Sequence, residues 1–104
     1  MKEYRIGEIL HSGSEGERGT KKCSPYDYER IDRTVMFDLF ELRKLMAEEG
    51  WILLPYKHDK DGSNLFSKFM LITPIQSINW FDDKKKVVVE TKNTIYNFYE
   101  VSKK

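Results

Sequence analysis

The chain has 104 residues, of which 34% are charged and 39% hydrophobic, and this length and composition predict one domain over residues 1–104. Its 18 basic and 17 acidic residues leave a formal net charge of +1, which excludes a whole-molecule field that steers the protein to nucleic acid. The single cysteine, Cys23, excludes an internal disulfide. Because acidic residues interrupt the apolar N-terminal stretch and no apolar run approaches the roughly 20 residues of a membrane span, we expect a cytoplasmic protein without a signal peptide.

The N-terminal third combines a short strand with a long loop. Residues 3–10 predict a strand, and the β-prone residues 33–37 predict another. Residues 11–28 between them hold almost no aliphatic side chain and open with several glycines and serines. A segment of this length without a regular pattern is either functional or flexible, so we expect a mobile loop over 11–28.

One helix is indicated from Asp38 to Glu49. Asp38 is an N-cap candidate, with Glu41 three residues later as in a capping box. Gly50 supplies a stop. The apolar positions fall on one face at helical spacing, and they are Leu39, Leu42, Leu45 and Met46.

After Gly50 the chain consists of short β-rich runs separated by polar turns. The expected strands are residues 51–57, 65–72, 77–81, 86–91 and 94–101. Pro74 ends or bends the second of these, and Lys92–Asn93 suits a tight turn because asparagine tolerates a positive φ. The connections are too short for the crossovers of a parallel sheet. We therefore predict an α+β fold, with an antiparallel curled sheet or a small partly closed β-barrel, one helix and a long N-terminal loop.

The same patterns predict the core. Alternation along the strands and the helical stripe select side chains that face inward. We expect burial of Leu42, Leu45, Ile52, Leu54, Phe69, Leu71, Val88 and Phe98.

Three segments resemble small uncharacterised β-rich bacterial and phage proteins. They are RIDRTVMFDLFEL, LITPIQSI and VVVETKNTIYNFYEV, which together cover about residues 30–101. The likeness consists of a threonine-proline step and a final strand pair of the form T-x-N-T-x-Y, carried here by Thr73, Pro74, Thr91, Asn93, Thr94 and Tyr96. Asp32 departs from the glycine expected at its position. The resemblance implies a small β-rich fold encoded by a phage or a mobile element, and it implies no activity.

The glycine-rich stretch Gly13–Lys22 raises the question of phosphate binding. A Walker loop has four residues between its glycines and then Lys followed by Ser or Thr, whereas Gly13 and Gly19 bracket five residues and Thr20 precedes Lys21. A mobile surface loop is one interpretation, and ordering of the basic segment around an anion or a nucleotide base is another. The candidate contacts are Arg18, Lys21, Lys22, Arg30, Arg33, Tyr26 and Tyr28.

Catalytic and metal-binding patterns are weak. His11, Cys23 and His58 lack the spacing of a zinc site. Residues 58–64 resemble the start of a calcium loop, but Lys68 stands where the motif needs a glutamate, and an Asp-Gly turn explains the stretch. We therefore expect no enzyme, no cofactor and no metal.

Aromatic residues on the predicted strands suggest an interaction surface. One small sheet with one helix does not easily cover both of its faces, so the sheet either curls or presents one face to a partner. The candidate partner face comprises Trp80, Tyr96, Phe98 and Tyr99. We predict a non-enzymatic binding module that engages a protein partner or forms a homo-oligomer. The alternative is a small β-barrel that binds nucleic acid or a nucleotide through the basic segment 18–33.

Overall fold

The computed structural model describes residues 1–101, which contain seven strands and two α-helices. In chain order these elements are β1 (Lys2–His11), α1 (Pro25–Arg30), β2 (Thr34–Phe37), α2 (Leu39–Ala47), β3 (Ile52–Pro55), β4 (Phe69–Ile72), β5 (Ile75–Phe81), β6 (Lys86–Thr91) and β7 (Thr94–Glu100). A short 3-10 turn, η1 (Asp82–Lys84), joins β5 to β6. The expected order of strands and of the longer helix is confirmed.

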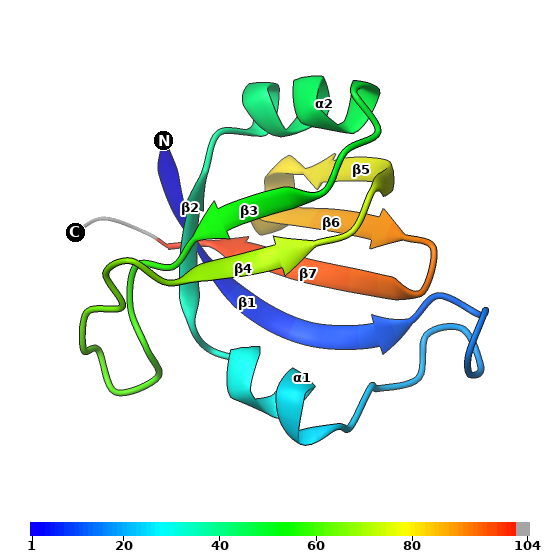
Figure 1. The fold of residues 1–104 in the computed structure, drawn as a ribbon, viewed down its shortest axis with the longest axis horizontal. Helices are drawn as coiled ribbons and strands as arrows, with labels where there is room; N and C mark the ends of the chain where they lie inside the picture. Colours follow the sequence, from blue (N-terminus) through cyan, green and yellow to red (C-terminus); the bar gives the residue numbers. More distant parts are fainter. Residues whose placement is uncertain (102–104) are drawn as a thin grey trace.

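The strands form two antiparallel sheets. Five strands pair in the order β2-β1-β7-β6-β5, and β3 pairs with β4 in a separate two-stranded sheet. Figure 1 shows β3 and β4 crossing in front of the larger sheet. An isolated bridge between Val35 and Tyr56 links the two sheets. The α+β class with antiparallel strands is confirmed, while the strands do not close into a barrel.

The core lies between the two sheets. Alternate side chains of each strand point inward, so β6 contributes Val87 and Val89, and β4 contributes Met70 and Ile72. Phe98 on the central strand β7 is fully buried. Helix α2 packs against β5 and adds Leu42, with Leu39, Leu45 and Met46 partly buried against the same cluster.

Helix α2 begins as predicted and ends differently. The Asp38 side chain accepts a hydrogen bond from the Phe40 backbone N–H at 2.9 Å, which satisfies one of the free amides of the first turn. At the other end Glu49, not Gly50, takes the left-handed conformation, with φ of 56°. The tight turn between β6 and β7 also forms, but Asn93 does not adopt the positive φ that the sequence suggested.

The prediction of one helix is wrong, because Pro25–Arg30 forms α1 where the expected loop included residues 25–28. Ser24 and Pro25 lie in the segment for which a loop was expected. They are instead the N-cap and first residue of a helix, positions that serine and proline favour for the same geometric reasons.

Four predicted core positions are corrected, and one of them is Leu45, which is only partly buried against the core. Phe69 and Leu71 are 54% and 39% exposed, while their neighbours Met70 and Ile72 are buried. All four residues of the run FMLI are apolar, so both sides of the strand are apolar. Alternation alone therefore does not decide which side faces the core. Val88 is only partly buried for the same reason, since it lies between two buried valines.

Residues 12–24 fold back on the sheet. The backbone N–H of Lys22 donates to the Ile9 carbonyl, and that of Gly19 to the His11 carbonyl, each at 2.9 Å. The Ser14 hydroxyl donates to the Asn93 side chain on the β6–β7 turn. The mobility expected of this segment stays a prediction.

Replacement of Leu42 by alanine tests the packing of α2. Leu42 is 1% exposed, so Leu42→Ala leaves a cavity and should lower the free energy of unfolding by about 2–5 kcal/mol. Phe40 on the same helix is 78% exposed, and Phe40→Ala should change it by less than about 0.5 kcal/mol. Urea denaturation measures both, and equal effects would contradict this placement of the helix.

Gly7 allows β1 to approach Tyr99. The β1–β7 register shifts between Ile6 and Ile9, and a Cβ at Gly7 would collide with the Tyr99 ring, which lies under the Arg5 guanidinium. Gly7→Ala should therefore lower the free energy of unfolding by about 1–3 kcal/mol. Gly50→Ala is the matched control, because nothing lies within 4 Å of its added Cβ. A thermal melt in which the two variants behave alike would refute the contact.

Candidate functional site

Helix α1 places one arginine in the interior. The Ser24 hydroxyl oxygen accepts from the Asp27 backbone N–H at 3.1 Å and donates to the Asp27 carboxylate at 2.6 Å. These two hydrogen bonds fix the first turn of the helix. Asp27 and Arg30, which are three residues apart, therefore lie on its inward face. Both are almost completely buried, at 3% and 4% exposure.

The guanidinium of Arg30 is held from several sides. One terminal nitrogen donates to the Asp27 carboxylate at 2.6 Å, and the other donates to the Tyr96 hydroxyl at 3.2 Å. The group also lies 4.1 Å from the centre of the Tyr26 ring and 5.4 Å from that of Tyr96. Burial disfavours the charge of Arg30, but Tyr96, Tyr26 and Asp27 outweigh it and raise its pKa.

A cavity of about 490 Å³ opens beside Arg30, and we call it the α1 cavity. It is bounded by the end of β1, the segment before α1, α1 itself, β4 and the β6–β7 turn. The lining residues are His11, Glu15, Lys22, Cys23, Ser24, Tyr26, Asp27, Arg30, Leu71, Thr73, Asn93, Thr94 and Tyr96. The Lys22 ammonium donates to the Thr94 hydroxyl oxygen at 3.0 Å, which positions a cation at the wall of the cavity.

The structure divides the predicted anion contacts into two groups. Lys22, Tyr26 and Arg30 line the α1 cavity. Arg18 lies elsewhere, because its guanidinium forms an ion pair with Glu90 on β6 and donates to the Ser12 carbonyl at 2.8 Å. Lys21 and Tyr28 are exposed and do not line the cavity.

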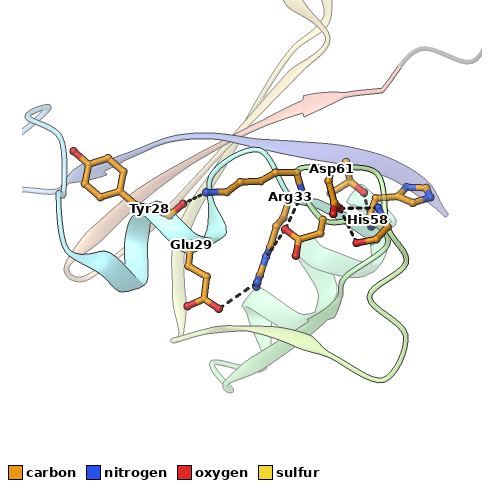
Figure 2. A network of polar contacts seen from close by, with 9 residues as sticks. Tyr28, Glu29, Arg33, His58 and Asp61 are labelled. Carbon is orange, nitrogen blue, oxygen red and sulfur yellow. Dashed lines mark hydrogen bonds and ion pairs between the residues drawn. The ribbon is translucent and has the colours of Figure 1, made fainter.

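Arg33 belongs to a network that attaches α1 to the β3–β4 connection. It donates to Glu29 at 3.2 Å and to Asp59 at 3.3 Å, and Figure 2 shows it between these two elements. In the same view the Lys60 ammonium donates to the Tyr28 backbone carbonyl. Since carboxylates on both sides neutralise Arg33, its role in the structure is to join segments.

The predicted aromatic partner face is not a surface in this fold. Phe98 is fully buried and Tyr96 is 6% exposed, so neither presents a side chain to a partner. The prediction failed for these two because β7 is the central strand and both its faces are covered. Trp80 is partly buried against the core, and Tyr99 is partly covered by Arg5 and Lys86.

An exposed apolar surface exists instead on the small sheet. Leu53 on β3 is directly opposite Leu71 on β4, and Phe69 is opposite Pro55. Leu53 is 60% exposed and Phe69 54%, while Trp51, just before β3, is 66% exposed. We call Trp51, Leu53, Phe69 and Leu71 the β3–β4 apolar face. The sequence signal was present, since both phases of these strands are apolar, but two of the four residues had been assigned to the core.

The three candidate metal and catalytic residues, His11, Cys23 and His58, do not all meet at one place. Across residues 1–101, no group of three or more His, Cys, Asp or Glu side chains is placed to hold a metal ion. The His58 ring lies 2.8 Å from the Glu3 carboxylate, next to β1. His11 and the exposed Cys23 line the α1 cavity at another place in the fold.

Comparison of the chain with family models, curated proteins and solved structures finds no match. The resemblance to small bacterial and phage proteins therefore stays a prediction. Within the part of the chain that the structure describes, neither helix has the length and apolar character needed to cross a membrane.

Loss of the Asp27 charge tests the anchor of α1. Burial raises the pKa of Asp27, but hydrogen bonds from Ser24 and Arg30 together with the charges of Arg30 and Lys22 outweigh it, so the pKa lies below its ordinary value. Asp27 therefore stabilises the fold above the unfolded-state pKa of about 3.9, and this contribution is lost as the pH falls through the lower folded-state pKa. At neutral pH, Asp27→Asn should lower the free energy of unfolding by about 3–5 kcal/mol, because it leaves a buried cation without its counter-ion.

The measurement is urea denaturation at a series of pH values. The difference between wild type and Asp27→Asn should shrink once the wild-type carboxyl becomes protonated. Glu29→Gln removes an exposed carboxylate from the same helix. It should lower the free energy of unfolding by less than about 1 kcal/mol at any pH. A difference between wild type and Asp27→Asn that does not depend on pH would contradict the assigned ion pair.

Proposed function

We propose that this protein is a non-enzymatic binding module that associates through the β3–β4 apolar face, and that its first partner is a second copy of the chain. The observation that carries the proposal is the exposed row of Leu53, Phe69 and Leu71 beside Trp51. Exposed contiguous apolar surface of this kind marks interaction sites in soluble proteins.

The size of the face suits a protein interface. From typical side-chain areas of about 150–250 Å² for aromatic residues, the four residues together expose on the order of 400 Å². A standard interface buries about 800 Å² on each partner, so this face supplies the apolar centre and leaves a polar rim.

The edge of β4 supports a second copy as the occupant. β4 pairs only with β3 among the described strands, so its other edge carries backbone groups that are free of ladder bonds. Two β4 edges related by a two-fold axis perpendicular to the sheet pair antiparallel into one four-stranded sheet, which sets the two apolar faces side by side as one continuous surface. The net charge of +1 adds little repulsion between copies.

The cytoplasm is the compartment we propose for this module, because its one cysteine cannot form an internal disulfide and a reducing compartment suits such a chain. An origin in a phage or mobile element is part of the same proposal, and it rests on the resemblance of residues 30–101. The alternative function, binding of a nucleotide or nucleic acid, is favoured by a separate observation, the α1 cavity, and is developed below.

Sedimentation velocity at increasing protein concentration tests the proposal. The wild type should form dimers, and Phe69→Lys should shift the protein to monomers, because it places a charge in the centre of the face. Phe40→Lys is the matched control, since Phe40 is also exposed but lies on α2. Monomers at every concentration, or equal effects of the two substitutions, would exclude this face as a self-association surface.

A further inference from the structure

The α1 cavity contains polar groups that the fold leaves unsatisfied. Among the described residues, three buried side-chain polar atoms find no hydrogen-bond partner, and two of them are His11 Nδ1 and Arg30 Nε. Both side chains line this cavity. Buried polar atoms in folded proteins are nearly always paired, so two unpaired atoms behind the wall of one cavity set this region apart from the rest of the fold.

Lys22 and Arg30 supply positive charge at the cavity, and Asp27 and Glu15 supply negative charge. Both Asp27 carboxylate oxygens are already occupied, one by Arg30 and the other by the Ser24 hydroxyl. The Lys22 ammonium has three N–H groups and gives one to Thr94, so two remain to donate. The Thr94 hydroxyl accepts from Lys22 and keeps its own hydrogen to donate. These groups suit an oxyanion such as phosphate.

A flat surface lies at the same cavity. The Tyr26 ring contacts the Arg30 guanidinium at 4.1 Å on one face and is nonetheless 58% exposed. Arg30 is itself immobilised by Asp27 and Tyr96, so the tyrosine ring is held in place while more than half of the residue stays exposed. Aromatic rings presented in this way stack on nucleic-acid bases.

We propose that the α1 cavity binds a mononucleotide, with the phosphate on Lys22 and Thr94 and the base stacked on Tyr26. The cavity volume of about 490 Å³ falls within the range of roughly 300–1,000 Å³ found for small-molecule sites. Glu15 also lines the cavity and is exposed, so its carboxylate repels the phosphate and weakens the affinity. Free nucleotides and the ends of single-stranded nucleic acid share this chemistry, and titration with a short oligonucleotide beside AMP distinguishes the two.

Isothermal titration calorimetry with AMP at low salt is the test. AMP should bind, while adenosine and inorganic phosphate, which each supply half of the contacts, should bind at least about tenfold more weakly. Raising the salt concentration should weaken AMP binding. No binding of AMP at low salt overturns the proposal, as does adenosine binding equal to that of AMP. A short single-stranded oligonucleotide that binds more tightly than AMP overturns the assignment to a free nucleotide.

Neighbouring residues provide matched controls for the site. Lys22→Gln should weaken AMP binding about tenfold or more, while Lys21→Gln should leave it unchanged, because Lys21 does not line the cavity. Tyr26→Ala should weaken it at least about fivefold through lost stacking, and Tyr28→Ala should not. Glu15→Gln should strengthen binding.

Thermal melts of the variants separate binding from folding. Lys22→Gln and Tyr26→Ala must melt as folded proteins for the comparison, and Glu15→Gln alters an exposed side chain that the fold does not need. A gain in affinity for Glu15→Gln is a result that damage to the structure does not produce. Lys21→Gln as harmful as Lys22→Gln, or Glu15→Gln without effect, would overturn the site assignment.

Discussion

The buried guanidinium of Arg30 is the constraint on which the lower half of the molecule depends. An arginine cannot lose its charge in a protein, so its burial requires an anion and hydrogen-bond acceptors at fixed positions. Asp27 supplies the anion, and Tyr96 on the central strand supplies a hydroxyl oxygen. A helix of six residues has little stability of its own, and this ion pair explains why α1 stays folded against the sheet. The same pair also shapes the α1 cavity and holds the Tyr26 ring at its wall.

The two-layer arrangement explains why one apolar surface is left uncovered. The inner sides of both sheets meet in one core, and α2 packs against β5. In Figure 1 α1 lies below β1 and α2 lies above β5, so neither helix covers the outer side of β3 and β4. Burial of Met70 and Ile72 forces Phe69 and Leu71 outward, because alternate residues of a strand point to opposite sides. The exposed row is therefore a direct result of filling the core with the alternate side chains of the same strand.

The two candidate surfaces meet at one residue. Leu71 belongs to the β3–β4 apolar face and also lines the α1 cavity. A partner on the face and a ligand in the cavity would therefore both contact β4, although the groups that attract them differ. The face offers apolar area without charge, whereas the cavity offers Lys22, Thr94 and an aromatic ring. This difference in chemistry allows each proposal to be tested by substitutions that leave the other surface intact.

Local patterns in the sequence determined the order of the elements and much of the core. The capped start of α2 at Asp38 and the burial of Leu42, Ile52, Leu54 and Phe98 follow from spacing and side-chain type alone. Only the tertiary structure decided the phase of β4, because both of its sides are apolar and packing against the other sheet selects one of them. It also decided which basic residues act together: Lys22 and Arg30 reach one cavity, while Arg18 and Arg33 are paired with distant carboxylates. Electrostatic pairing across many residues depends on the folded positions of both partners, and no spacing along the chain records it.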